Sequence, residues 1–240
     1  MHSFKNPLII ALDFDNVEEA LKIVEKIGPY AGGFKVGMQL YYSAGQEVLL
    51  RLREKELPVF ADLKLHDIPN TVAGAARALT RQGAAILNVH AAGGKAMMRA
   101  ALEAARDETD KAGTVRPLVV AVTVLTSFDQ ESFKQEMGHS GTIQDRVVAW
   151  ALMAREAGLD GVVASPLEIA AIRKACGPDF TIITPGIRPA GTAIHDQKRT
   201  LTPREALKQG ADYLVVGRPV TAAHDPLEAV KAIRNEIDSR

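Results

Sequence analysis

Short apolar runs alternate with longer amphipathic stretches along the chain, and this alternation constrains the fold more than any other feature of the sequence. The apolar runs have the length of buried strands, and the stretches between them repeat their apolar residues with the period of a helix. Eight such pairs in 240 residues allow about 30 residues for each, which is the size of a strand–helix unit. We expect strands at 8–12, 33–36, 59–63, 85–89, 118–124, 161–163, 181–183 and 213–216, and helices at 17–27, 44–55, 72–82, 95–111, 144–158, 166–175, 203–209 and 226–237.

These units predict a single α/β domain, a (β/α)8 TIM barrel over residues 1–240 with its active site at the C-terminal ends of the strands. No low-complexity linker or change of composition divides the chain. An open, doubly wound parallel sheet is the alternative. It is less favoured because no glycine-rich dinucleotide-binding fingerprint follows the first strand.

The composition argues against several classes of partner. Lys+Arg and Asp+Glu both number 29, so the formal net charge is zero and nothing indicates binding to nucleic acid or to an anionic membrane. The longest apolar run, 118–125, is too short to cross a bilayer, and the N-terminal residues lack the apolar core of a signal peptide. The single cysteine, Cys176, excludes an internal disulfide and fits a reducing compartment. We therefore expect a cytoplasmic protein without membrane or nucleic-acid partners.

Two acids and a lysine lie close together at the end of the third apolar run. Asp62 and Lys64 are two residues apart, so on a regular strand their side chains point the same way. Asp67 lies just beyond the strand, where a loop can return it toward them. Charges on the inner face of a buried strand are costly unless they are paired or functional. A structural Asp–Lys ion pair is one interpretation and a catalytic cluster is the other, and the rest of the sequence favours the second.

Polar residues also follow most of the other expected strands. In a barrel these positions share one rim, so their side chains converge there. Lys35 on the second strand, with Asp62, Lys64 and Asp67, predicts an array of four charges in which each lysine lies between carboxylates. A lone polar residue at such a position is more often satisfied by its neighbours than functional. The other candidates on this rim are Asp13, Asn88, His90, Thr126, Ser127, Arg188 and Arg218.

The end of the eighth strand has the composition of a phosphate site. Gly217 permits close approach of a backbone N–H to an anion, Arg218 offers a bidentate guanidinium, and Pro219 marks the start of a helix. A surface salt bridge of Arg218 is the alternative interpretation. The loop 184–200 after the seventh strand is long, as in binding loops and lids, and it carries Arg188 and Gln197, which can reach an anion when it closes.

The order of these motifs resembles the orotidine 5′-phosphate decarboxylases of the bacterial type, and the resemblance covers the whole chain. Its central element is Asp62-x-Lys64-x-x-Asp67-Ile68-Pro69-Asn70-Thr71, together with Lys35 in Phe-Lys-Val-Gly. An isolated Asp-x-Lys-x-x-Asp is only moderately specific, whereas the complete set in this order is strong. The other matching segments are Ala-Leu-Asp at 11–13, Val-His-Ala-Ala-Gly-Gly at 89–94, Leu-Thr-Ser at 125–127, Thr-Pro-Gly-Ile-Arg at 184–188 and Val-Gly-Arg-Pro at 216–219.

The resemblance implies a cofactor-free decarboxylation of orotidine 5′-phosphate to uridine 5′-monophosphate, the last step of de novo pyrimidine synthesis. Lys64 would stabilise the carbanion formed at C6 of the pyrimidine and protonate it. Asp62 would lie near the departing carboxylate, while Lys35 and Asp67 would hold Lys64 charged and oriented. The protein must supply this stabilisation through fixed charges, because the ring cannot delocalise the electron pair left at C6.

The same resemblance implies the substrate contacts and the assembly. The protein would be a homodimer, with Asp67, Ile68 and Thr71 reaching into the site of the neighbouring chain. Asp13 and Lys35 would contact the ribose hydroxyls and Thr126 the pyrimidine. The phosphate and the closing loop would be held by Arg188, Gln197, Gly217 and Arg218.

Three other functions remain as alternatives. Metal-dependent relatives, 3-keto-gulonate 6-phosphate decarboxylase and hexulose phosphate synthase, share the Asp-x-Lys-x-x-Asp element but place a metal-binding glutamate on the second strand. The sequence has Lys35 there, so we expect no metal site. The second alternative is a barrel that binds a phosphate ligand without catalysis, which the intact charge cluster disfavours. The third is an isomerase or epimerase, disfavoured because the acids beside Lys64 stabilise an ammonium rather than a free base.

Overall fold

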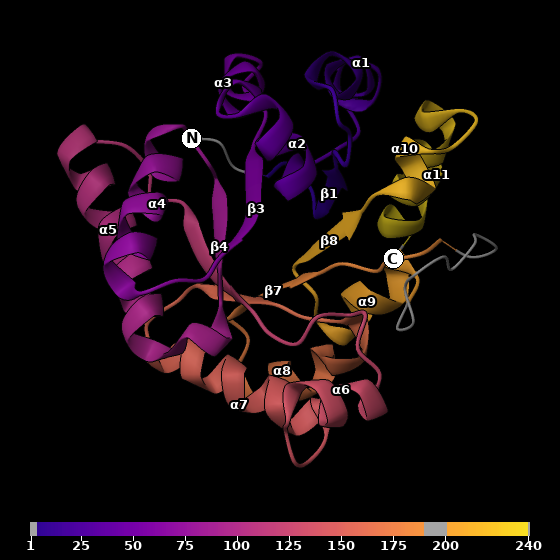
Figure 1. Ribbon diagram of the computed structural model, residues 1–240. Coiled ribbons are helices and arrows are strands. Elements are labelled where there is room, and N and C mark those ends of the chain that lie inside the picture. Colours follow the sequence, from indigo (N-terminus) through magenta and orange to yellow (C-terminus); the bar gives the residue numbers. More distant parts are fainter. Residues whose placement is uncertain (1–3, 190–200, 240) are drawn as a thin grey trace.

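Eight parallel strands close into a barrel in the computed structural model, which describes residues 4–189 and 201–239 (Figure 1). Each strand pairs with the next along the chain, and β8 closes the barrel against β1. The prediction of a (β/α)8 barrel is therefore confirmed. The strands are β1 (Leu8–Ala11), β2 (Gly33–Gly37), β3 (Val59–Leu65), β4 (Ile86–His90), β5 (Leu118–Val122), β6 (Gly161–Val163), β7 (Thr181–Thr184) and β8 (Tyr213–Val216).

Helices surround the barrel and connect each strand to the next on its outer side (Figure 1). Several begin at the capping residues that the sequence provides. Asn16 accepts hydrogen bonds from the first turn of α1, and Thr202 forms a capping box with Glu205 in α9. The helices are α1 (Val17–Ile27), α2 (Met38–Ala44), α3 (Glu47–Glu54), α4 (Pro69–Arg81), α5 (Gly94–Ala112), α6 (Gln130–Met137), α7 (Ile143–Glu156), α8 (Ile169–Cys176), α9 (Pro203–Gln209), α10 (Arg218–Thr221) and α11 (Pro226–Asp238), with short 3₁₀ turns at Ala91–Gly93 and Pro166–Glu168.

Several of the expected helices have different bounds in the structure, among them those expected over 44–55 and 72–82. The helix expected over 44–55 is α3, which begins only at Glu47, and a separate helix, α2, precedes it and ends at its C-cap Gly45, which adopts a φ of 64°. The helix expected to begin at residue 72 begins at Pro69, whose fixed φ suits the first turn. The second difference affects the site, since it places Ile68 at the N-cap of α4 and Thr71 in its first turn.

The apolar residues form an inner and an outer core because side chains alternate between the two faces of each strand. The inner core lies inside the barrel and is small, and it includes Phe60 and Ile86. The outer core packs between the barrel and the helices and includes Phe34 and Leu87. Inward positions near the C-terminal ends of the strands carry polar side chains instead, and the site is built from these.

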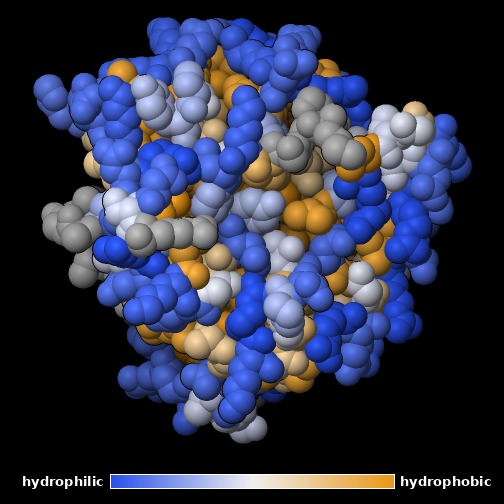
Figure 2. Space-filling model, turned by 180° about the vertical axis from the view of Figure 1, so that it is seen from behind, coloured by the Kyte–Doolittle hydropathy of each residue, from blue (hydrophilic) through white to orange (hydrophobic). Residues whose placement is uncertain are grey.

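Polar side chains cover most of the face seen in Figure 2, with smaller apolar areas between them. This distribution fits amphipathic helices that bury one side against the barrel. Within the described ranges, no helix combines the length and the apolar character needed to cross a membrane. Cys176 is buried at the end of α8, and burial raises the pKa of its thiol, in keeping with a packing role.

Candidate active site

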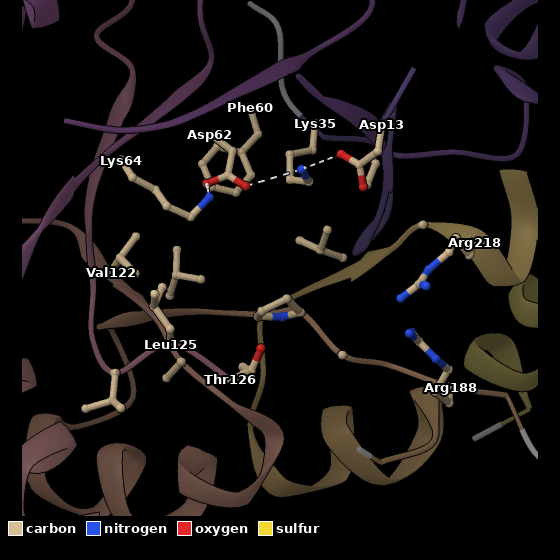
Figure 3. Close-up of a pocket in the computed structure, with 18 residues that line it drawn as sticks. Asp13, Lys35, Phe60, Asp62, Lys64, Val122, Leu125, Thr126, Arg188 and Arg218 are labelled. Carbon is tan, nitrogen blue, oxygen red and sulfur yellow. Dashed lines mark hydrogen bonds and ion pairs between the residues drawn. The ribbon is translucent and has the colours of Figure 1, made fainter. Parts of the chain in front are cut away.

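A cavity of about 270 Å³ opens at the C-terminal ends of the strands (Figure 3). It has charged groups at two ends and an apolar wall between them. Strands β1, β2 and β3 supply one charged end, and the segments after β7 and β8 supply the other. The residues that line the cavity are Ala11, Asp13, Lys35, Phe60, Asp62, Lys64, Val122, Val124, Leu125, Thr126, Val163, Ala164, Pro185, Gly186, Arg188, Val215, Gly217 and Arg218.

The first charged end is a chain of alternating acids and lysines. Lys35 Nζ lies 3.1 Å from Asp13 Oδ1 and 3.2 Å from Asp62 Oδ2. Lys64 Nζ lies 2.8 Å from the other oxygen of Asp62, Oδ1. Both oxygens of one buried carboxylate therefore face an ammonium group. The predicted convergence of Lys35, Asp62 and Lys64 is confirmed in the geometry of the chain.

Mutual attraction favours the charged forms of Asp62 and Lys35 despite their burial. Burial alone favours the neutral form of Asp62, but the charges of Lys35 and Lys64, with hydrogen bonds from Lys64 and Asn88, lower its pKa below the usual carboxyl value. Burial also disfavours the charged form of Lys35. The negative charges of Asp62 and then Asp13 have a larger effect in the opposite direction, so the pKa of Lys35 is raised. The site thus holds fixed charges of both signs where a substrate displaces water.

Lys64 reaches the cavity from an irregular strand. Its backbone has a φ of 52°, in the left-handed region that a residue with a side chain rarely adopts. The register between β3 and β4 shifts between Ala61 and Leu65, so the regular alternation behind the prediction does not hold there. Lys64 and Asp62 point to the same place, as expected, but a local bulge puts them there. Backbone strain of this kind is concentrated at functional sites.

Two guanidinium groups form the second charged end. Arg188 and Arg218 point toward one another across the cavity from the lysines (Figure 3). Arg188 is buried and donates one hydrogen bond to the carbonyl of Ile187, while its Nε has no hydrogen-bond partner. Burial and then the charge of Arg218 lower the pKa of Arg188. Two cations that repel one another in a partly buried site are complementary to a dianion such as a phosphate ester.

The structure leaves some predicted site residues away from the cavity of the same chain. Among the described residues, no ion pair joins Asp67 to either lysine, and Asp13 rather than Asp67 completes the array. Asp67 instead accepts a hydrogen bond from the backbone N–H of Ile68, whose side chain is 66% exposed. Within one chain the array therefore contains three of the four expected charges, because the loop after β3 leads into α4, and a place for Asp67 at the site of a neighbouring chain stays a prediction. Thr71 lies on that helix and does not line the cavity, and Gln197 falls outside the described residues.

Asn88 is the residue whose role the sequence analysis missed. It is fully buried in the middle of β4, donates a 2.7 Å hydrogen bond to Asp62 Oδ1, and accepts one of 2.8 Å from the backbone N–H of Lys64. The available signal was a polar residue at an inward position of an apolar strand, two residues after Ile86. That position implies a polar partner inside the barrel.

His90 adds a titratable group behind the array. Its ring lies 5.3 Å from that of His66, centroid to centroid. Burial, then His66 and Lys64, lower the pKa of His90 below the ordinary histidine value. The folded protein therefore binds this proton less readily than the unfolded chain does.

We expect the fold to lose stability as the pH falls from about 6.5 through the lowered pKa of His90, since the unfolded state takes up the proton first. His90→Gln should remove this part of the pH dependence. The imidazole is partly exposed, so solvent screening limits the effect to at most about 1 kcal/mol, or about 2–4 °C in Tm. Thermal melts of both proteins between pH 5 and 8 provide the measurement, and parallel Tm curves would contradict the assignment.

A barrel with a charged cluster at one end of its rim cavity and paired guanidiniums at the other defines a (β/α)8-barrel enzyme that acts at the C-terminal ends of its strands. The family model described as orotidine 5′-phosphate decarboxylase / HUMPS family matches residues 6–233. The chain belongs to this family.

Relatives of known name agree over nearly the full length. The chain is 55% identical over 238 residues to a Moorella thermoacetica protein named orotidine 5′-phosphate decarboxylase, which covers 99% of this chain and 94% of the relative. A Syntrophomonas wolfei protein of the same name is 51% identical over 96% of this chain and 97% of its own length. The solved structure of orotidine 5′-phosphate decarboxylase from Lactobacillus acidophilus aligns with a TM-score of 0.86 and 40% identity, over 98% of this chain and 100% of that one.

Proposed function

We propose that the protein converts orotidine 5′-phosphate to uridine 5′-monophosphate and CO2 in pyrimidine synthesis, without a metal or organic cofactor. Family membership and the full-length identity to proteins of that name support the reaction. The observation that carries the proposal is the two-ended cavity, with a guanidinium pair at one end and the Asp13–Lys35–Asp62–Lys64 array at the other. A nucleotide carries its phosphate and its reacting base at opposite ends in the same way.

The electron pair left at C6 is the chemical problem. When the C6–CO2 bond breaks, both electrons remain in an orbital in the plane of the ring, where the π system cannot accept them. Lys64 Nζ is the proposed cation that stabilises this charge, and it then donates a proton to C6 to complete uridine 5′-monophosphate. Solvent returns the proton to the amine. The hydrogen bond to Asp62 holds the ammonium in place beforehand, so the charge need not reorganise during the reaction.

Asp62 and Lys35 have complementary proposed roles. Asp62 would face the substrate carboxylate and disfavour it relative to the neutral CO2 that leaves. Lys35 keeps Asp62 ionised and, with Asp13, is placed to bind the ribose hydroxyls. The apolar wall formed by Val122, Val124, Leu125, Val163 and Pro185 would contact the faces of the planar pyrimidine, with Thr126 supplying a polar contact to its edge.

The donor set argues against a divalent metal in this reaction. Oxygen-rich sites with several free carboxylates are what Mg²⁺ and Ca²⁺ prefer. The buried carboxylate of Asp62 instead has an ammonium group on each oxygen, and these cations would repel a metal ion. In the ranges that the structure describes, no group of three or more His, Cys, Asp or Glu side chains is arranged to hold a metal.

Ultraviolet absorbance of orotidine 5′-phosphate with the purified protein, with and without EDTA, tests the proposal. We expect conversion to the spectrum of uridine 5′-monophosphate at a rate that EDTA does not change. Loss of activity in EDTA would refute the metal-free reaction. Absence of conversion by a folded protein would refute the decarboxylase assignment and direct attention to sugar-phosphate substrates, because the family description also covers the HUMPS branch.

We also propose a homodimer in which Asp67, Ile68 and Thr71 complete the site of the neighbouring chain. All three lie on or next to the start of α4, away from the cavity of their own chain, and Ile68 exposes 66% of its surface. An exposed large apolar side chain next to a carboxylate at the rim fits a contact across subunits.

Subunit mixing tests this arrangement. Lys64→Ala and Asp67→Ala chains should each be nearly inactive alone, because each removes one part of every site. In a refolded equimolar mixture, mixed dimers carry one intact site, so about a quarter of the wild-type activity should return. A monomer by sedimentation, or no recovery in mixtures shown to contain mixed dimers, would contradict the proposal.

A further inference from the structure

The backbone ladder between β3 and β4 is interrupted beside the charge array. Phe60 and Ala61 pair in register with Ile86 and Leu87, and pairing resumes only at Leu65 with Val89. Three residues of β3, from 62 to 64, therefore lie opposite Asn88 alone. A bulge of this kind leaves backbone groups without their ladder partners, and in a buried place these groups need other partners.

The Asn88 side chain supplies the missing partner. Its Oδ1 accepts the backbone N–H of Lys64 at 2.8 Å, at the residue whose φ is 52°. Its Nδ2 donates to Asp62 Oδ1 at 2.7 Å, and the same Oδ1 accepts a 2.8 Å hydrogen bond from Lys64 Nζ. The three residues thus form a closed ring of hydrogen bonds that joins the backbone of Lys64 to its own ammonium group through Asp62.

Burial makes this ring rigid. Asn88 is 0% exposed and does not line the cavity, so it cannot exchange these partners for water or for the substrate. Left-handed backbone at a residue with a side chain costs about 1–3 kcal/mol and persists only where the surroundings enforce it. A buried side-chain amide whose oxygen and nitrogen are both hydrogen-bonded, as in Asn88, can enforce this backbone conformation.

We propose that Asn88 is a positioning residue for the decarboxylation, which holds Lys64 in its left-handed conformation and fixes Asp62 Oδ1 against the Lys64 ammonium. The inference rests on the proposed function. Asn88 touches neither substrate nor reacting atoms and acts through the other two residues. A purely structural role would affect stability without a specific effect on the chemical step.

Asn88→Leu removes both hydrogen bonds while keeping the number and branching of the side-chain heavy atoms. We expect kcat to fall about 10²-fold, as for a displacement of a reacting group by about 1 Å, while KM changes less than about threefold. KM should be spared because the guanidinium pair at the other end of the cavity is untouched. Thr109→Val is the matched control, since Thr109 is a buried residue of α5 whose hydroxyl hydrogen bonds go to helix carbonyls. It should lower Tm and leave kcat unchanged.

The pH dependence of kcat in Asn88→Asp distinguishes a positioning role from a packing role, because protonation changes the hydrogen bonds of the new side chain but hardly its size. Ionised, the new carboxyl still accepts the Lys64 N–H but repels Asp62; protonated, it accepts from Lys64 and donates to Asp62 as the amide does. The other titratable groups nearby are Lys35 on β2 and the histidines His66 and His90. The kcat of this variant relative to wild type should therefore rise as the pH falls from 8 to 6, by up to about tenfold for each pH unit. The ratio for Asn88→Leu should be flat over the same range.

Wild-type turnover is measured beside the variants. An inactive wild type would contradict the proposed reaction, whereas the Asn88 variants test the positioning role only when the wild type is active. Given an active wild type, a kcat within about threefold of it in folded Asn88→Leu would overturn the positioning role. So would a flat ratio for Asn88→Asp, which also provides the test if Asn88→Leu does not fold.

Discussion

Replacing Lys64 with alanine will lower kcat by at least about 10⁴-fold, because the substitution removes both the proton donor and the cation beside C6. Uridine 5′-monophosphate should still bind within about tenfold of its wild-type affinity, since its phosphate is held at the other end of the cavity. Absorbance assays of turnover give kcat, and calorimetric titration with uridine 5′-monophosphate gives the affinity for the product.

The variant should remain folded, because the Lys64 side chain is partly exposed and alanine meets the same backbone strain at a φ of 52°. Lys55→Ala is the control, since Lys55 forms a surface ion pair with Glu25 at 3.1 Å, remote from the cavity. It should leave turnover unchanged. A Lys64→Ala protein with more than a tenth of the wild-type kcat would remove Lys64 from the centre of the mechanism.

The fold was predictable from the sequence because its dominant signal is local. Eight apolar runs separated by amphipathic helices permit few arrangements, and the strand positions agree with the structure to within one or two residues. The start of α3 was expected too early because Gly45 ends the preceding helix α2 with a positive φ that is not visible in the periodicity of residues 44–55. Boundaries set by a single backbone conformation are less predictable than elements set by many side chains.

The site was predictable where it depends on strand ends and not where it depends on pairing between strands. Five of the site residues lie in the C-terminal parts of strands of one barrel or in the segments that follow them, so their convergence follows from the topology: Asp13, Lys35, Asp62, Arg188 and Arg218. The inward position of Asn88 indicates a buried polar partner, but its role depends on a bulge in the neighbouring strand β3 that the sequence pattern does not reveal. The position of Asp67 relative to its own chain's cavity was not predictable, because the direction of a loop after a strand is set by the helix that follows, here the early start of α4 at Pro69.

Arg218→Ala will lower kcat/KM for orotidine 5′-phosphate by about 10³-fold, which corresponds to about 4 kcal/mol for losing one of two charge-assisted contacts to the phosphate. The physical reason is the pair of guanidiniums, because an anion bound between them is attracted by both and offsets the effect of the Arg218 charge on Arg188. Arg188 then remains but holds the phosphate alone, in a position where burial already disfavours its charge. Steady-state kinetics of the folded variant give the measurement, with Arg234→Ala on the outer helix α11 as the control that should behave as wild type.

A truncated substrate distinguishes phosphate binding from general damage to the site. With orotidine, which lacks the phosphate, wild type and Arg218→Ala should have kcat/KM values within about threefold of one another, since the lost contact is made to a group that is absent. An equal loss on both substrates would mean that Arg218 supports the structure of the cavity and does not bind phosphate. The phosphate effect can appear in kcat as well as in KM. In that case, binding energy at the guanidinium end organises the charges around Lys64, which faces the same cavity.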